Sequence, residues 1–218
     1  MIRLVAFDMD GTLVDVKSSW AAVHDHFGDS NAEAVRLFET DQIDDVEFMR
    51  RDIALWWKHN PRITVDDLEA ILARVPLMPG AVELFQGLRE RHVLTAIVSG
   101  GIDLLARRIG RELGVDYVLA NGFRVDSGGR LTGEGTVRVP IKGKEEVLRG
   151  IQAQLGVGPD ETASVGNSDI DVGLFRRSRI GVAFLPEDDR VRAHATSIVE
   201  VKDLRRVLPL LFPPARPS

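Results

Sequence analysis

Four short, mostly apolar runs, each followed by a polar or glycine-rich turn, constrain the fold of this 218-residue chain most strongly. The runs are residues 2–7, 93–98, 162–165 and 180–184. Apolar runs of this length without polar alternation are typical of strands buried on both faces, as in a parallel sheet. Segments of helical periodicity separate them, at residues 81–91, 102–113 and 144–155. This alternation predicts an α/β fold with a doubly wound parallel sheet.

Three segments depart from the alternation. Large apolar residues recur at helical spacings from about residue 16 to Pro76, which predicts an inserted domain of three or four short helices. We therefore expect a helical domain at residues 15–79 and a core domain made of residues 1–14 and 80–218. Residues 126–129, Asp-Ser-Gly-Gly, separate two alternating runs and predict a β-hairpin within residues 121–140. The proline-rich tail, residues 213–218, is expected to be a frayed end.

Composition excludes several classes of function. The chain has no cysteine, so disulfides, thiolate metal sites and cysteine nucleophiles are excluded, and a metal must have oxygen or imidazole ligands. A net charge of −5 argues against nucleic acid or an anionic membrane as partner. The first apolar run ends at Asp8, too short for a signal peptide or a membrane helix, so we expect a cytoplasmic protein.

The most polar motifs follow the predicted strands, where open α/β sheets bind their ligands. Asp8 and Asp10 come directly after the first strand. Two carboxylates at this spacing can supply a nucleophile and a proton donor, and their oxygens suit a hard cation such as Mg²⁺. Ser99, Gly100 and Gly101 follow the second strand, and a hydroxyl beside exposed backbone N–H groups suits a phosphate group.

The run Asp8-Met9-Asp10-Gly11-Thr12-Leu13 resembles the first motif of the haloacid dehalogenase superfamily of aspartate-dependent phosphatases. The resemblance extends to the branch that is similar to phosphoserine phosphatase, whose Rossmann-like core carries a small helical cap. It implies that Asp8 attacks phosphorus to form an aspartyl-phosphate. It also implies that Asp10 protonates the leaving alcohol and later deprotonates the hydrolytic water.

Two further motifs of the family have counterparts here. Ser99, Gly100 and Gly101 resemble the second motif, which implies that they bind the transferring phosphoryl group. A lysine is needed to offset the crowded negative charge of two carboxylates and a phosphate. Lys142 is followed by glycine, as is common in this branch, whereas Lys144 has the expected spacing to an apolar pair. We favour Lys144 as the catalytic lysine, with Lys142 as the alternative.

The fourth motif is implied by the run from Gly166 to Asp171, with one departure from the family pattern. The usual metal-ligating aspartate is Asn167, whose amide oxygen can bind Mg²⁺ but carries no charge. By resemblance, Asp8, Asp10, Asn167 and Asp171 form the Mg²⁺ site, and Asp171 orients the lysine or a metal-bound water. A site made inactive by Asn167 is the alternative.

The helical insert is expected to select the leaving group by closing over the site. In phosphoserine phosphatases a cap glutamate and a cap arginine read the substrate. No glutamate follows the first motif here, whereas Arg51, or its neighbour Arg50, can take the part of the arginine. The predicted activity is a Mg²⁺-dependent phosphomonoester hydrolase acting on a small phosphorylated metabolite, similar to phosphoserine.

Two alternatives to hydrolysis stay open. One is a phosphotransferase or mutase of the same fold, and the other is a non-catalytic binding module that has lost the metal. We also expect a candidate homodimer, formed by the cap or by the apolar stretch at residues 207–212.

Overall fold

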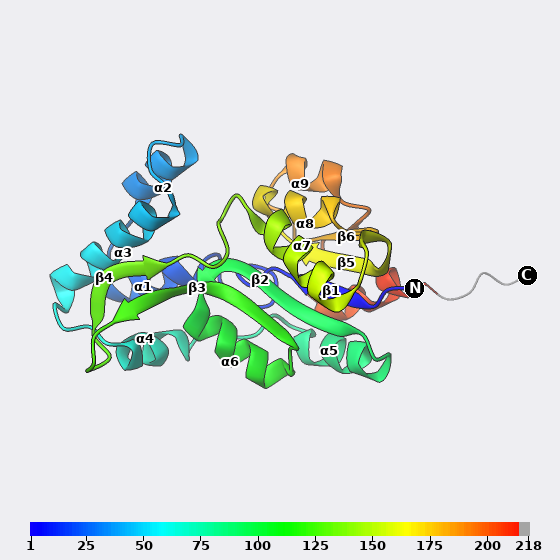
Figure 1. The fold of residues 1–218 in the computed structure, drawn as a ribbon, viewed down its shortest axis with the longest axis horizontal. Helices are drawn as coiled ribbons and strands as arrows, with labels where there is room; N and C mark the ends of the chain where they lie inside the picture. Colours follow the sequence, from blue (N-terminus) through cyan, green and yellow to red (C-terminus); the bar gives the residue numbers. More distant parts are fainter. Residues whose placement is uncertain (214–218) are drawn as a thin grey trace, which may run out of the picture.

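The computed structural model describes residues 1–213, so the predicted frayed end at residues 213–218 lies, except for its first residue, outside the described residues. Its centre is a seven-stranded sheet in the order β4-β3-β2-β1-β5-β6-β7 (Figure 1). The strands are β1 (Leu4–Phe7), β2 (Leu94–Ile102), β3 (Tyr117–Val125), β4 (Leu131–Thr136), β5 (Thr162–Gly166), β6 (Ile180–Phe184) and β7 (Ser197–Val199). The doubly wound α/β fold expected from the sequence is confirmed.

The central strand, β1, sets the position of everything that follows. It pairs in parallel with β2 on one side and with β5 on the other. All four of its residues have 0% exposure, because helices cover both faces of the sheet there. The strand order reverses at β1, and in open α/β sheets the crevice at such a reversal is the usual place for a ligand.

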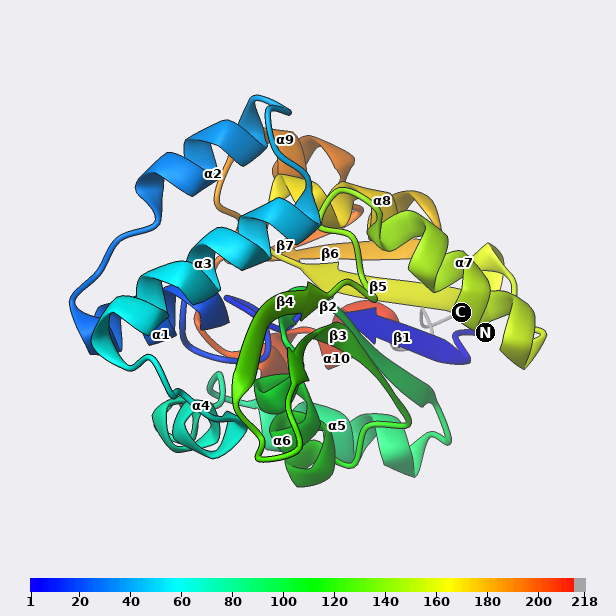
Figure 2. The same ribbon diagram turned by 60° about the vertical axis from the view of Figure 1, so that its left-hand side comes forward.

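Two layers of helices enclose the sheet, one on each face (Figures 1 and 2). One layer contains α5 (Ala81–Glu90), α6 (Asp103–Leu113) and α10 (Leu208–Leu211). The other contains α7 (Lys144–Leu155), α8 (Val172–Arg176) and α9 (Asp189–His194). Short 3₁₀ turns, η1 (Pro159–Glu161), η2 (Asp169–Asp171) and η3 (Leu204–Arg206), complete the connections.

The apolar C-terminal stretch packs on the chain's own core. Val207 and Leu211 have 0% and 3% exposure. Leu208 packs against α5 so closely that a Cβ on Gly87 would lie 2.5 Å from it. Residues 207–212 are therefore largely occupied within the chain, and the expected homodimer stays a prediction.

Four helices lie between β1 and α5, as the insert predicts: α1 (Ser19–Phe27), α2 (Ala32–Glu39), α3 (Asp45–His59) and α4 (Val65–Leu72). Apolar residues of α1, α3 and α4 join the main hydrophobic core. Trp20 of α1 stacks on Trp56 of α3 at 5.7 Å between ring centroids, and Phe123 of β3 packs edge-on against both. α3 thus rests on β4, while α1 packs against α3 and α4, and α2 packs against α3 (Figure 2). The division into domains at residues 15 and 79 stays a prediction.

The structure differs from the sequence expectation in three places. β2 continues through Ser99, Gly100 and Gly101, so the second motif lies inside the end of a strand and α6 begins only at Asp103. β3 begins at Tyr117 and pairs in parallel with β2 before it turns antiparallel to β4. The short edge strand β7 was not expected. In residues 1–213 we find no helix with the length and apolar character needed to cross a membrane.

Candidate active site

The carboxyl ends of β1, β2 and β5 bring three of the sequence motifs to one cavity. Asp8 follows β1, Ser99 lies near the end of β2, and Asn167 follows β5. The cavity has a volume of about 480 Å³. It is lined from the sheet side by Asp8, Asp10, Ser99, Gly100, Gly101, Lys144 and Asn167, and from the helical insert by Lys17, Asn31, Val35, Glu39 and Phe48, among others.

Lys144, the first residue of α7, forms ion pairs with two carboxylates at the base of the cavity. Its ammonium lies 2.8 Å from Asp8 Oδ1 and 2.6 Å from Asp171 Oδ1, and its side chain is 1% exposed. Burial alone would lower the pKa of Lys144, but the two carboxylates raise it above its ordinary value. The lysine is therefore a fixed positive charge beside Asp8.

Asp8 is itself buried and electrostatically strained. Burial and the neighbouring Asp171 raise the pKa of Asp8 to about 7, whereas Lys144 acts in the opposite direction. A carboxylate held away from water beside a single cation is poised to react as a nucleophile once its charge is compensated.

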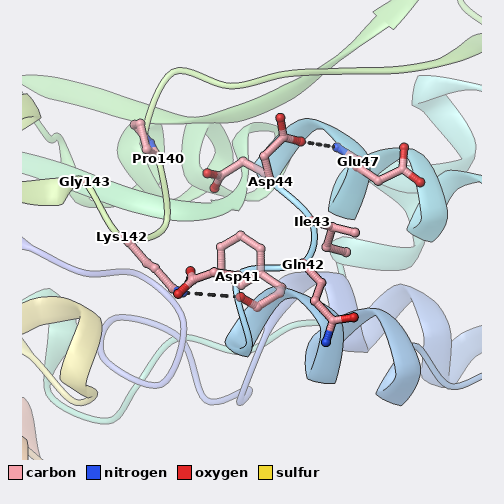
Figure 3. A pocket seen from close by; sticks show the side chains of 10 residues that line it. Asp41, Gln42, Ile43, Asp44, Glu47, Pro140, Lys142 and Gly143 are labelled. Carbon is pink, nitrogen blue, oxygen red and sulfur yellow. Dashed lines mark hydrogen bonds and ion pairs between the residues drawn. The ribbon is translucent and has the colours of Figure 1, made fainter.

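Lys142, the alternative to Lys144, lies outside this cavity. It is half exposed and pairs with Asp41 in the connection between α2 and α3. Figure 3 shows this pair at the edge of a separate pocket, with Pro140 and Gly143 on one side and Asp44 on the other. Of these two lysines, Lys144 is the one that contacts Asp8, so the choice of Lys144 over Lys142 agrees with the geometry.

Asp10 is held by the first residue of α1. The backbone N–H and the hydroxyl of Ser19 both donate to Asp10 Oδ2, each at 2.8 Å. The other oxygen, Oδ1, is buried and has no hydrogen-bond partner among residues 1–213. Burial raises the pKa of Asp10 to about 6, although the hydrogen bonds from Ser19 lower it. A carboxyl group with this pKa can give and take a proton near neutral pH.

The second motif differs in detail from the expectation. Ser99 is 1% exposed, and its hydroxyl accepts a hydrogen bond from Gly101 N–H at 3.1 Å. The Gly101 N–H is thus already occupied, and the motif expected at a helix N-terminus lies at the end of β2. The Gly100 carbonyl accepts hydrogen bonds from Trp20 Nε1 and Asn121 Nδ2, which fixes the loop.

Asn167 occupies the place where the sequence predicted a metal ligand. Its Oδ1 accepts from the Thr12 hydroxyl at 3.4 Å, and its Nδ2 donates to Glu187 at 3.3 Å. The loop after β1 packs tightly on it: Gly11 has a φ of +71°, and a Cβ there would lie 2.4 Å from Asn167 Nδ2. This close approach brings the first and fourth motifs together.

Asp171 does not face the cavity as a free ligand. It is wholly buried, with Oδ1 on Lys144 and Oδ2 accepting from the backbone N–H groups of Asn167 and Ser168. Both oxygens of Asp171 are thus engaged within the protein, and its expected metal role stays a prediction. Asp171 positions the lysine and the turn that carries Asn167.

The donors that remain for a cation are oxygens. No group of three or more His, Cys, Asp or Glu side chains in residues 1–213 is arranged to hold a metal ion. Among the motif residues first expected to bind the metal, Asp8, Asp10 and the neutral amide of Asn167 line the cavity, and the carboxylates of Glu39, Asp169 and Glu187 also line it. Carboxylate and amide oxygens are the ligands that Mg²⁺ accepts, so the donor set fits this ion with one negative charge fewer than three carboxylates would supply.

The structure does not bring Arg51 to the cavity, and its expected part in substrate binding stays a prediction. Its guanidinium is held by Glu47 at 2.9 Å on the same helix. Arg50 pairs with Glu47 and, across to β4, with Glu134. Both arginines thus have carboxylate partners on the protein itself, because α3 presents Glu47 one turn earlier.

Sequence reasoning missed Ser19, Thr12 and Glu187. Thr12 stands inside the first motif, and that position was the sequence signal that could have identified it. Ser19 reaches Asp10 because the chain turns back between β1 and α1. Glu187 lies in the connection after β6, far from any motif, and no local pattern marks it.

Known proteins agree with this architecture. Residues 5–176 match the family model described as haloacid dehalogenase-like hydrolase. The chain is 31% identical over 211 residues to the phosphoserine phosphatase of Wolinella succinogenes, covering 95% of this chain and 98% of the relative. It is 28% identical over 213 residues to that of Methanocaldococcus jannaschii, covering 94% and 96%.

A third relative, the phosphoserine phosphatase of Archaeoglobus fulgidus, is 31% identical over 84% of this chain, and the match spans only 52% of that relative. Among solved structures, a substrate-bound phosphoserine phosphatase complex superposes with a TM-score of 0.81 at 25% identity, covering 96% of this chain and 98% of that one. The family expected from the four motifs is confirmed. The chain belongs to the haloacid dehalogenase-like hydrolases, in their phosphoserine phosphatase-like branch.

Proposed function

We propose that this protein is a Mg²⁺-dependent phosphomonoester hydrolase that works through an aspartyl-phosphate. The observation that carries the proposal is the contact of Lys144 with Asp8 at 2.8 Å, in a cavity that also contains Asp10, Ser99 and Asn167. A nucleophile, an acid and base group, a buried cation and a hydroxyl within one cavity are what phosphoryl transfer requires.

Each side chain has a distinct part in this proposal. Asp8 supplies the attacking oxygen, and Asp10 protonates the leaving alcohol and then activates water. Ser99 and the backbone at Gly100 hold phosphoryl oxygens, and Lys144 offsets the negative charge that gathers there. Electrostatic groups fixed in a buried site stabilise a developing charge without reorganisation.

The cation would be held by Asp8 and Asn167, with Asp10 contributing an oxygen other than the one that carries its proton. When bound, Mg²⁺ supplies positive charge that offsets the phosphoryl oxygens and Asp8. Burial and Asp171 raise the pKa of Asp8 to about 7, so added positive charge would favour its reactive, ionised form.

The substrate class we propose is a small phosphorylated metabolite similar to phosphoserine. The names of the relatives support this class. The cavity wall contributed by the helical insert carries Lys17 and Glu39, one cation and one anion. Those charges suit a leaving group that has both a carboxylate and an ammonium. In this proposal Lys17, and not Arg50 or Arg51, faces the carboxylate.

The test is phosphate release by purified protein from phosphoserine and from p-nitrophenyl phosphate, with Mg²⁺ and with EDTA, beside the Asp8→Asn variant. The proposal predicts turnover that requires both the metal and Asp8. Diversion of phosphate to added alcohol or sugar acceptors would instead favour a phosphotransferase. Absence of turnover from folded wild-type protein on all phosphate esters would favour a binding module.

A further inference from the structure

Ser19 lies outside the recognised motifs, yet both its backbone N–H and its hydroxyl form hydrogen bonds with Asp10. It is wholly buried at the first position of α1. Its N–H and Oγ both lie 2.8 Å from the same oxygen of Asp10, Oδ2. Two donors on one carboxylate oxygen make that oxygen an acceptor and leave the other oxygen as the place for a proton.

The direction of the Ser19 hydroxyl proton follows from its second contact. The backbone N–H of Ile102 donates to Ser19 Oγ at 2.9 Å. A hydroxyl has a single proton to donate and two lone pairs that accept. Ile102 is a donor and takes a lone pair, so it does not receive the Ser19 proton. The proton of Ser19 therefore points to Asp10 Oδ2.

The local packing fixes this arrangement. A Cβ on Gly101 would lie 2.7 Å from both Asp10 Oδ2 and Ser19 Oγ, so the strand end approaches the pair as closely as glycine allows. Asp10 Oδ1, by contrast, is buried without a partner in the described part of the chain, and Asp10 lines the active-site cavity. One carboxylate oxygen is thus anchored and the other is free to react.

We propose that Ser19 is a positioning residue that anchors Oδ2 of Asp10, so that Oδ1 carries the proton delivered to the leaving group. This inference rests on the proposed phosphatase function. In the first step a bond forms between Asp8 and phosphorus, the bond from phosphorus to the leaving oxygen breaks, and the proton on Asp10 Oδ1 passes to that oxygen. In the second step Asp10 takes a proton from water, the water oxygen bonds to phosphorus, and the bond between phosphorus and Asp8 breaks.

A hydrogen bond from the next residue of α1 also fixes a part of the active site. Trp20, the next residue, donates from its indole Nε1 to the Gly100 carbonyl at 3.1 Å. The start of one helix of the insert therefore holds both the proton donor and the loop of the second motif. Substitution of Ser19 should disturb proton delivery while Trp20 keeps that loop in place.

The test compares two leaving groups. An alkyl phosphate such as phosphoserine must have its leaving oxygen protonated, whereas p-nitrophenolate leaves as a stable anion. The Ser19→Ala variant is expected to lose about tenfold to a hundredfold in kcat/KM with the alkyl ester, a part of what a general acid contributes. With p-nitrophenyl phosphate the loss is expected to stay within about threefold, because kcat/KM reports transfer to Asp8 and not the later hydrolysis.

Variants of matched size separate positioning from folding. Ser19→Thr keeps the hydroxyl and should restore activity toward the alkyl ester. Ser19→Cys has nearly the size of serine but is a weak donor, so it should show the same selective loss even where Ser19→Ala does not fold. Ser164→Ala is the control, because Ser164 is equally buried on β5 and its hydroxyl has no partner in residues 1–213.

Each outcome decides the matter. A selective loss with the alkyl ester, rescued by threonine, supports the proposal. Equal losses with both esters, or no loss with folded Ser19→Ala and Ser19→Cys, would overturn it while leaving the phosphatase function intact. Wild-type protein without turnover on either ester would overturn both.

Discussion

The ammonium of Lys144 lies 2.6 Å from a carboxylate oxygen of Asp171, and both side chains are almost completely buried, at 1% and 0% exposure. Asp171 is in turn fixed by the backbone of the turn after β5. This pair therefore connects α7 to the loop that carries Asn167, and it orients the ammonium group of Lys144 toward Asp8. Buried charge pairs cost desolvation energy, which the additional hydrogen bonds around Asp171 offset.

Replacement of this lysine should therefore affect both catalysis and stability. Lys144→Met is expected to lower kcat about a hundredfold or more and to lower the free energy of unfolding by about 3 kcal/mol, because two buried carboxylates lose their cation. Steady-state kinetics and urea unfolding measure these two effects. Lys142→Ala is the matched control, since its exposed pair with Asp41 contributes little. An inactive Lys142→Ala beside an active Lys144→Met would contradict the assignment.

Because Asn167, the proposed metal ligand, carries no charge, we expect weak Mg²⁺ binding that a single substitution can strengthen. Asn167→Asp adds a negative charge at the cation site and should lower the Mg²⁺ concentration for half-maximal activity by about tenfold. Calorimetric titration with Mg²⁺ provides a readout independent of turnover, and Asn167→Ala, which removes the ligand oxygen, should bind less tightly than wild type. Equal affinity of all three proteins would show that residue 167 does not bind the metal.

The stability of the metal-free protein should depend on pH through Asp10. Burial raises the pKa of Asp10 to about 6 from its ordinary 3.8. The folded chain thus binds this proton more tightly than the unfolded chain, so the free energy of unfolding falls as the pH rises through this window.

Asp10→Asn removes this cost of burying a charge. Relative to wild type, we expect the variant to gain on the order of 2 kcal/mol between about pH 4 and about pH 7, because each pKa unit corresponds to about 1.4 kcal/mol. Denaturant unfolding in EDTA at both pH values measures the gain, with the exposed Asp160→Asn as control. A gain of equal size in both variants, or a loss in Asp10→Asn, would be inconsistent with this explanation.

Arg51 should have little part in substrate binding, because Glu47 holds its guanidinium away from the cavity. Arg51→Ala is expected to change KM for phosphoserine by less than about twofold, and Lys17→Ala, at the cavity wall, to raise it more. Kinetics of the two variants side by side make the comparison. A larger effect of Arg51→Ala would mean that the insert rearranges when substrate binds.

The sequence predicted the sheet well because its strands are buried on both faces. An uninterrupted apolar run such as residues 180–184 has few other stable placements, and β6 has these bounds. The end of β2 was harder to predict, because Ser99, Gly100 and Gly101 read as a loop, although parallel pairing with β3 resumes at Ile102. Short edge strands such as β7 carry too few residues for a periodic signal.

The site was predictable where its residues lie inside a motif at a strand end. Asp8, Ser99 and Asn167 meet because the parallel strands β1, β2 and β5 place their carboxyl ends at one edge. Lys144 reaches Asp8 from the first position of α7. Ser19 could not be identified in this way, since its role depends on how α1 begins after a turn. Arg51 was assigned by resemblance. In the structure it forms an ion pair with Glu47, which residue spacing alone did not reveal.

The central claim is that Asp8 becomes phosphorylated during turnover. The most direct measurement adds borohydride to the wild-type protein as it turns over substrate with Mg²⁺, and then maps the modified peptide by mass spectrometry. Borohydride reduces an aspartyl-phosphate to homoserine. The account predicts this conversion at Asp8, dependent on substrate and absent from Asp8→Asn. Turnover without modification of Asp8, or with modification at another carboxylate, would contradict it.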